Sequence, residues 1–202
     1  MNKIFLFSIF LLFKTCTFIT GQSLAVPTGT FVSPVDYLYR LSGGFSELRE
    51  THFHAGIDIK PSIKGKKDRI YSIANGYISR IKISPGGYGY GVYIDHPEIG
   101  YSSVYGHMES FSTRIEEVAK WHQQKNESFE IDIPLSSDIL PVAKGEVIGI
   151  MGNTGFSFGD HLHFEVRDTK TEKPINPFIF GFSAPDKVAP SLAHISIHGL
   201  DE

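Results

Sequence analysis

Short runs in which apolar and polar residues alternate make up much of this chain. Alternation with a period of two is typical of β-strands that bury one face. The runs cover residues 69–74, 76–83, 90–95, 101–105 and 162–167, with a further apolar-rich run over 142–151. Turn-forming residues such as Pro85-Gly86-Gly87 separate them. The pattern predicts a mainly β protein whose antiparallel sheet curls into a barrel or sandwich that hides its edges.

One segment has helical periodicity instead. Its apolar positions recur at a spacing of three to four residues: Ile115, Val118, Ala119 and His122. With a capping-box pattern from Thr113 to Glu116, they predict one short helix over residues 113–125. Residues 109–140 as a whole are interpreted as an insertion near the active-site rim, either a wall that selects substrate or a variable surface excursion. Trp121 is expected to pin the helix to the sheet.

The first residues have the features of a secretory signal. A basic start is followed by a short apolar run over residues 4–13, which Lys14 interrupts. We therefore predict a signal peptide over residues 1–21 and export to the periplasm, the cell envelope or the medium, with an uncleaved membrane anchor as the alternative. The run is too short to span a bilayer comfortably, so no stable membrane insertion is expected after cleavage. Cleavage removes Cys16, the only cysteine, so the mature chain has no disulfide.

The remaining chain is expected to hold one domain, over residues 26–182. Residues 183–202 are interpreted as a Pro-containing linker and the possible start of a further domain, because residues 192–197 alternate like a strand. Of the 19 basic and 22 acidic residues, two basic ones lie in the signal, which leaves a net charge of −5. That balance argues against a nucleic-acid partner. The sequence leaves the oligomeric state open.

Histidines and an aspartate form two spaced motifs, one early and one late. His54 and Asp58 flank Gly56, and His161 and His163 are two residues apart. Side chains two apart on a strand share a face, so each motif can direct its two side chains into one space. Three imidazole or carboxylate ligands leave a fourth position open for water, which is typical of a catalytic zinc site. Gly56 is expected to let an ion or substrate approach the backbone.

Two further motifs complete a recognisable series: Tyr105-Gly106-His107-Met108 and Gly152-Asn153-Thr154-Gly155. In the order of its motifs and in the residues within each motif, the series from about Phe45 to Pro177 resembles the lysostaphin/LytM-type zinc endopeptidases. The resemblance implies the duplicated-hybrid-motif type of β fold, peptidoglycan peptides as substrate, and one Zn²⁺. It also implies a role for five residues: His54, Asp58 and His163 as metal ligands, and His107 and His161 as catalytic residues.

Other residues are candidates around this centre. Glu165 lies two positions after His163 and, on the same strand face, could orient that ligand. The Gly-rich stretch over residues 86–91 lacks the helix and Lys-Ser or Lys-Thr of a phosphate loop, so it is interpreted as a turn that lets a peptide lie near the backbone. Tyr88 and Tyr90 would flank that groove, and Asn153 is a further candidate.

The function predicted is hydrolysis of peptidoglycan cross-links or stem peptides by metal-activated water. Proton transfer is assigned to His107, while His161 is expected to reach the water or the oxyanion; the two roles could be exchanged. The bond that is cut stays open. The alternative is a catalytically silent LytM-like module that binds peptidoglycan or activates an amidase. All five positions are present here, which favours the enzyme.

Overall fold

The computed structural model describes residues 29–182 and residue 184, which form an antiparallel β-sheet with one α-helix. The helix, α1, spans Thr113–Asn126, and a short 3₁₀ helix spans Pro177–Phe180. The strands are β1 Leu41–Gly43, β2 Ile57–Ile59, β3 Arg69–Tyr71, β4 Gly76–Ile83, β5 Tyr90–His96, β6 Tyr101–Phe111, β7 Ile131–Pro134, β8 Pro141–Val142, β9 Val147–Met151, β10 Leu162–Asp168 and β11 Pro174–Ile175. The predicted mainly β class with one helix is confirmed.

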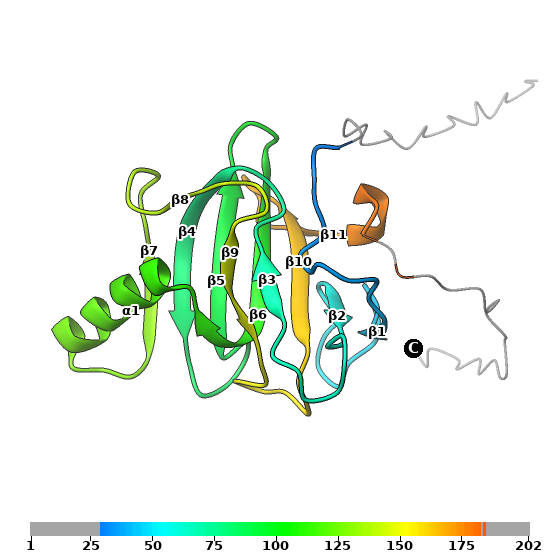
Figure 1. The fold of residues 1–202 in the computed structure, drawn as a ribbon, viewed down its shortest axis with the longest axis horizontal. Coiled ribbons are helices and arrows are strands. Elements are labelled where there is room, and N and C mark those ends of the chain that lie inside the picture. Colours follow the sequence, from blue (N-terminus) through cyan, green and yellow to red (C-terminus); the bar gives the residue numbers. More distant parts are fainter. Residues whose placement is uncertain (1–28, 183, 185–202) are drawn as a thin grey trace, which may run out of the picture.

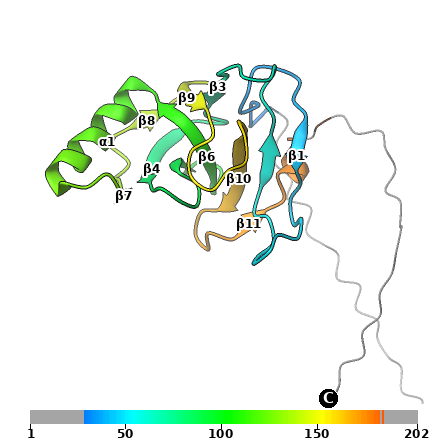
Figure 2. The same cartoon turned by 90° about the horizontal axis from the view of Figure 1, so that it is seen from below.

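The main path of the sheet runs β1-β2-β10-β6-β5-β4-β7, with every pairing antiparallel. Strands β4, β5, β6 and β10 lie side by side in Figure 1. Seen from below, α1 lies at one end of the molecule and β1 at the other (Figure 2). The two end strands, β1 and β7, do not pair with each other, so the sheet curls but stays open; of the two predicted forms, barrel or sandwich, it does not take the closed barrel.

Strand β6 changes partner along its length. Its first part pairs with β10 as far as Gly106, which lies opposite His163, and its last part pairs with β9 from Met108 onward. His107 lies at the change and has a left-handed φ of 59°. The sequence pattern predicts a strand that stops before His107, and this is wrong. The strand continues to Phe111 because Met108 and Phe111 join the hydrophobic core.

The hydrophobic core lies on one face of the main sheet and includes Ile70 of β3 and Ile148 and Met151 of β9. On β10, Leu162, Phe164 and Val166 are fully buried in it. Their neighbours His163, Glu165 and Arg167 alternate with them and point to the opposite face, as strand geometry requires. The polar face of β10 therefore carries His163 of the late motif together with Glu165 and Arg167.

Most predicted strands lie where the alternation places them: 76–83 coincides with β4, and 90–95 and 162–167 match β5 and β10 within one residue. The run over 142–151 is divided into β8 and β9, and that over 69–74 shortens to β3. The helix expected over 113–125 is α1. Its N-cap is Ser112, which makes no side-chain cap hydrogen bond, so the capping-box detail was wrong.

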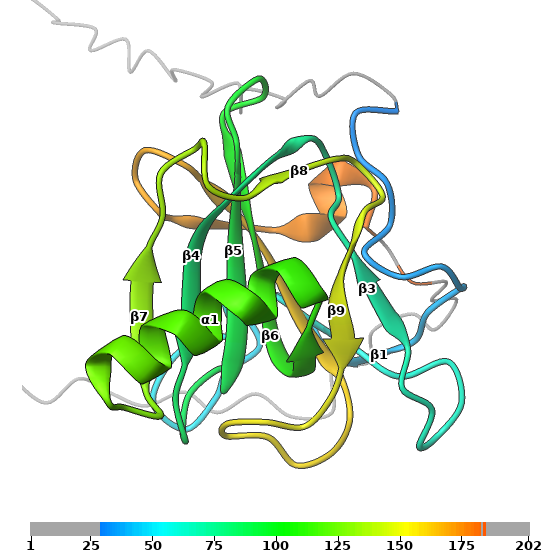
Figure 3. The ribbon, with the colours of Figure 1, turned by 60° about the vertical axis from the view of Figure 1, so that its left-hand side comes forward.

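Helix α1 crosses the strands on the core side (Figure 3) and buries Ile115 and Ala119. Trp121 does not pin it to the sheet: the residue is 54% exposed, and the Lys125 ammonium lies over its ring. The chain after the helix adds β7 to the edge of the sheet beside β4. That edge is four strands away from β10, roughly 19 Å at ordinary strand spacing. Because the sheet curls, however, Asp132 and Pro134 of β7 line one hollow together with Arg167 and Asp168 of β10. A role of residues 109–140 as a substrate wall stays a prediction.

The predicted signal peptide and most of the predicted linker, including the strand expected over 192–197, lie outside the described residues. Within the part of the chain that the structure describes, no helix is long and apolar enough to cross a membrane.

His96, at the end of β5, is fully buried. Its Nδ1 donates to the Asn75 carbonyl (2.9 Å), and its Nε2 lies 2.8 Å from Ser103 Oγ. Burial disfavours the imidazolium and lowers the pKa of His96 below the ordinary 6.5, although the Asn75 contact opposes this. The unfolded chain thus takes up this proton first as the pH falls.

We expect the contribution of His96 to the free energy of unfolding to be complete above pH of about 6.5 and to be lost as the pH falls below it. Urea unfolding between pH 7.5 and 5 should show a shallower loss of stability in His96→Gln than in wild type. His52→Gln makes the same change at an exposed histidine and serves as the control. Identical pH slopes for wild type and His96→Gln would contradict this prediction.

Candidate metal centre

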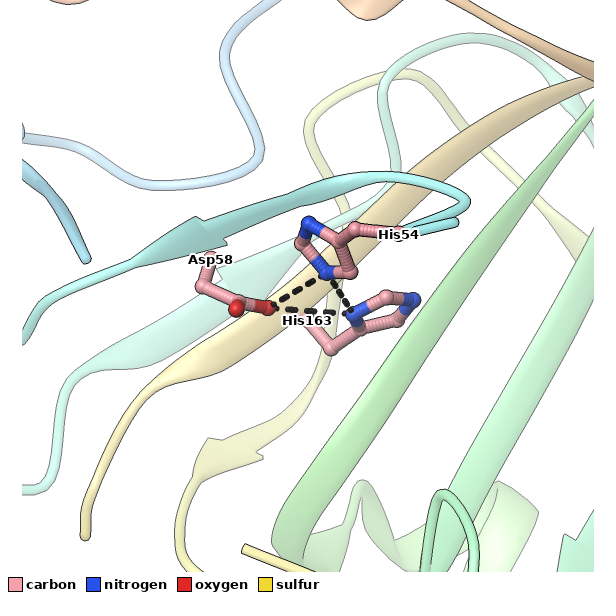
Figure 4. Close-up of side chains that lie close together, drawn as sticks. All are labelled: His54, Asp58 and His163. Carbon is pink, nitrogen blue, oxygen red and sulfur yellow. Dashed lines mark hydrogen bonds and ion pairs between the residues drawn. The ribbon is translucent and has the colours of Figure 1, made fainter. Parts of the chain in front are cut away.

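Strands β2 and β10 bring the early and late motifs together. Asp58 and His163 are directly opposite each other in the antiparallel register of these strands. His54 lies in the loop before β2, which backbone hydrogen bonds with Ser46 and Glu47 hold in place. Three atoms converge (Figure 4): His54 Nε2 and His163 Nδ1 are 3.0 Å apart, and Asp58 Oδ1 is 3.1 and 3.0 Å from them. All three residues are buried.

The other hydrogen bonds of these histidines decide which ring nitrogen carries the proton. His54 Nδ1 donates to the Gly44 carbonyl at 2.7 Å, and His163 Nε2 donates to Glu165 Oε1 at 2.7 Å. In neutral rings, both inward nitrogens then carry lone pairs that face each other and a carboxylate oxygen. Three acceptors at this separation repel one another unless a cation lies between them. Tetrahedral zinc with bonds of about 2.0–2.1 Å places its ligands roughly 3.3 Å apart, so the donor set fits this metal.

Electrostatics favour positive charge at this point. Burial alone would raise the pKa of Asp58, but the neighbouring His163 and His54 rings, when they carry a second proton, outweigh it and hold that pKa well below its usual range. Burial opposes the charged form of His163, yet contacts with Asp58 and Glu165 raise its pKa. The two carboxylates thus create a field that attracts a proton or a metal cation.

His107 and His161 lie beside the three converging residues without joining them. Their rings are 4.7 Å apart, and the His107 ring is 5.9 Å from that of His163. His107 Nδ1 donates to the Thr154 carbonyl at 2.8 Å, and His161 Nδ1 to the Gly159 carbonyl at 2.8 Å. Each Nε2 is thereby left with a lone pair, and that of His161 is 3.6 Å from Asp58 Oδ1. The structure therefore brings all five motif residues together.

The backbone at His107 is held in an uncommon conformation. The left-handed φ occurs at the bulge where β6 changes partner, and the His107 N–H donates to the Tyr88 carbonyl at 2.8 Å. Non-glycine residues rarely adopt this conformation, and where it occurs at a functional site the surrounding structure must hold it. Burial lowers the pKa of His107 to about 4. The ring is therefore neutral near pH 7 and able to accept a proton.

Glu165 orients His163, as the strand alternation indicates. It is fully buried, accepts from His163 Nε2, and receives Arg167 Nε at 2.6 Å on its other oxygen. Tyr88 stacks on the His163 ring, with centroids 4.7 Å apart, and its hydroxyl donates to Glu165 Oε1. Burial opposes ionisation of Glu165, but the His163 and Arg167 contacts lower its pKa to about 2. Such carboxylate–histidine pairs fix the tautomer of a metal ligand.

Two other candidates do not reach the centre. The Tyr90 ring packs against Phe111 and Phe129, next to the core. Asn153 Oδ1 accepts from the Gly159 N–H at 2.8 Å and shapes the loop that leads to His161. The sequence interpretation missed Arg49, whose guanidinium contacts Asp58. Arg49 belongs to none of the motifs, so no sequence signal indicated it; Arg167 could have been found from the same alternation as Glu165.

The glycines serve packing between protein segments. A Cβ at Gly56 would lie well under 3 Å from the Phe164 carbonyl, so this glycine admits β10 and not an ion or substrate. Gly89 and Gly155, both with positive φ, approach each other's backbone equally closely. The Gly-rich stretch thus packs against the loop after β9. The Thr154 carbonyl of that loop accepts the hydrogen bond from His107. Gly89 and Gly155 thus contact protein, whereas a Cβ at Gly86 or Gly87 would meet no atom within 4 Å, so a close contact of peptide with that part of the stretch stays a prediction.

This fold and this donor set define a family. The sequence profile of peptidase family M23 matches residues 52–124 and 138–177. The DD-carboxypeptidase/endopeptidase Mpg of Neisseria meningitidis serogroup B is 30% identical over 171 residues, which cover 82% of this chain and 32% of that protein. The chain belongs to peptidase family M23, and the predicted resemblance is confirmed. It spans about a third of the length of the curated relatives it matches.

Solved structures share the fold. A zinc containing peptidase from Vibrio cholerae superposes with a TM-score of 0.52 at 22% identity, over 76% of this chain and 39% of that chain. The catalytic domain of lysostaphin from Staphylococcus simulans superposes with a TM-score of 0.50 at 20% identity, over 72% of this chain and 93% of that chain. At these identities the likeness concerns the fold alone.

We expect purified protein to bind one zinc ion per chain, because a single group of three converging donors is found among the described residues. His163→Ala should lose this metal, since it removes one of the three donors. Elemental analysis after dialysis measures the zinc content, with His52→Ala as the control at an exposed histidine. Equal zinc in wild type and His163→Ala would exclude this ligand set.

Gly56→Ala should lower both stability and zinc content, because its methyl group would displace β10 from the loop that carries His54. Overpacking of this kind costs about 1–3 kcal/mol. Gly86→Ala is the matched control, since a Cβ there meets no atom within 4 Å. Thermal melts and metal analysis would refute the prediction if both variants behaved like wild type.

Proposed function

We propose that this chain is a zinc-dependent endopeptidase that hydrolyses peptide bonds in the stem peptides or cross-links of peptidoglycan. The observation that carries the proposal is the convergence of three lone-pair atoms within 3.1 Å, with two further histidines beside them that are not part of the group. The name of the Neisseria relative, which describes a carboxypeptidase and endopeptidase, supports the same class of reaction.

The proposed cofactor is one Zn²⁺ held by His54, Asp58 and His163. Zinc in such a site lowers the pKa of a water and polarises a peptide carbonyl. The protein supplies the groups that move protons. His107 is the proposed base, because the Thr154 carbonyl holds its Nδ1–H and leaves the lone pair of Nε2 available to accept a proton.

His161 is the proposed partner for the oxyanion that develops on the scissile carbonyl. Its Nε2 lies near Asp58 Oδ1, and its Nδ1 is held by the Gly159 carbonyl with Ser157 Oγ 3.3 Å away. A histidine fixed in this way can donate to an oxyanion when it is protonated. The division of roles between His107 and His161 belongs to the proposal.

Loops next to the centre offer apolar surface to a peptide. Leu48 and Phe53 lie on the hairpin before His54, and Phe156 and Phe158 lie on the loop before His161; all four are largely exposed. Loops on a rigid sheet commonly bind substrate. Export is proposed with this substrate, because cell-wall peptides lie outside the cytoplasm and the N-terminal sequence resembles a secretory signal.

A catalytically silent module is the competing function. Such a module has no need of a base aimed by a strained backbone, or of a carboxylate that fixes a ligand tautomer. Both features are present here, at His107 and Glu165. We therefore favour the enzyme.

His107→Asn and His161→Ala should keep the zinc and lower kcat by roughly a hundredfold or more, the size expected when a positioned base or oxyanion donor is removed. Asn is chosen at position 107 because it tolerates the left-handed backbone. Metal analysis and peptide-cleavage rates would be measured on the same preparations. Loss of zinc from either variant would instead identify that histidine as a ligand.

Digestion of purified peptidoglycan fragments should produce new peptide ends that mass spectrometry assigns to one bond. The wild type is expected to cleave, and chelator-treated protein should regain the activity when zinc is returned. Binding of fragments without any new ends, in zinc-loaded wild type, would favour the silent module.

A further inference from the structure

Arg49 contacts the oxygen of Asp58 that faces away from the other ligands. Its Nη2 lies 3.0 Å from Asp58 Oδ2, whereas Oδ1 faces His54 and His163. The arginine is held at the turn of a small hairpin, where its N–H donates to the His52 carbonyl at 2.9 Å and the preceding Leu48 pairs with Phe53. The two oxygens of Asp58 are therefore occupied by different partners.

The neighbouring strand leaves room for this contact. Gly43 on β1 pairs with Asp58 in the sheet, and a Cβ there would lie well under 3 Å from both Arg49 Nη2 and Asp58 Oδ2. Any side chain at position 43 would therefore force the two groups to move. A Cβ on the adjacent Gly44 would meet no atom within 4 Å. The clash is specific to the position that borders the ion pair.

The contact is only partly shielded from water on the arginine side. The Arg49 side chain is 36% exposed and shares Nη2 with Glu47 at 3.2 Å, whereas the Asp58 side chain is 12% exposed. Its Nε is buried and has no hydrogen-bond partner among the described residues, which is a cost. An arginine placed at a cost beside a metal ligand is better explained by what it does to that ligand.

We propose that Arg49 is a positioning residue that restricts Asp58 to one metal-binding oxygen. Carboxylates bind metals through one oxygen or through two. If Asp58 used both, its second oxygen would occupy the coordination position that a catalytic zinc site keeps open. By holding Oδ2, Arg49 keeps that position available to water. This inference rests on the proposed zinc site and says how the site stays catalytic.

The test uses cobalt(II) as the probe metal, because its visible absorption weakens when coordination rises from four to five ligands. Arg49→Met removes the guanidinium but keeps the length of the side chain, and Gly43→Ala disturbs the same contact from the other strand. Both variants should bind one cobalt ion with weaker visible absorption than wild type. With zinc, kcat should fall about tenfold to a hundredfold at unchanged KM. Arg49→Lys should recover part of both losses.

Gly86→Ala and Lys64→Met are the controls and should keep the wild-type spectrum and kcat, since a Cβ at Gly86 meets no atom within 4 Å and Lys64 is an exposed cation outside the site. Wild-type spectra in both Arg49→Met and Gly43→Ala would overturn the proposal. A rise in KM alone in Arg49→Met would also overturn it, because Arg49 would then bind substrate. If wild type binds cobalt but cleaves no wall peptide, the proposed function fails, while the spectra still decide the role of Arg49.

Discussion

The pairing of β2 with β10 is the constraint on which the rest of the site depends. It places Asp58 opposite His163 although 105 positions separate them in sequence. Because strand side chains alternate, the same register that buries Leu162 and Phe164 in the core directs His163 and Glu165 to the polar face. A shift of one residue would bury the ligand and expose the core residues, so packing of the core and assembly of the metal centre select the same register.

Around this pairing, each polar atom of the centre has a second partner that fixes its direction. The carbonyl groups of Gly44, Thr154 and Gly159 accept hydrogen bonds from His54, His107 and His161, and Glu165 accepts one from His163. The ring nitrogens that face the centre, among them His54 Nε2 and His163 Nδ1, therefore carry lone pairs. Backbone carbonyls cannot change protonation, so the tautomers of three histidines follow directly from the fold. The proposed role of Arg49 applies the same logic to the carboxylate ligand.

Close backbone contacts make this arrangement possible. The site is built from loops and strands that approach one another where a side chain would not fit, at Gly43, Gly56, Gly89 and Gly155. These glycines therefore allow close packing between segments of the protein itself. The approach of Gly89 to Gly155 also brings Tyr88 and Thr154 to either side of His107. The strained φ of His107 is held by these neighbours.

Local periodicity and motif order were enough to predict most strands and the set of chemically active residues. Alternation predicted β4, β5 and β10 to within a residue, because a half-buried strand must repeat every two positions, and motif order indicated the five residues that the structure gathers. Closure of the sheet, the length of β6 and the direction of several side chains depend on contacts between segments distant in sequence, which local periodicity does not contain. Whether the sheet closes depends on β1 and β7 meeting, and the length of β6 depends on its second partner, β9. Tyr90 turned to the core, Trp121 to solvent, and Arg49 to Asp58, because each orientation is set by segments distant in sequence.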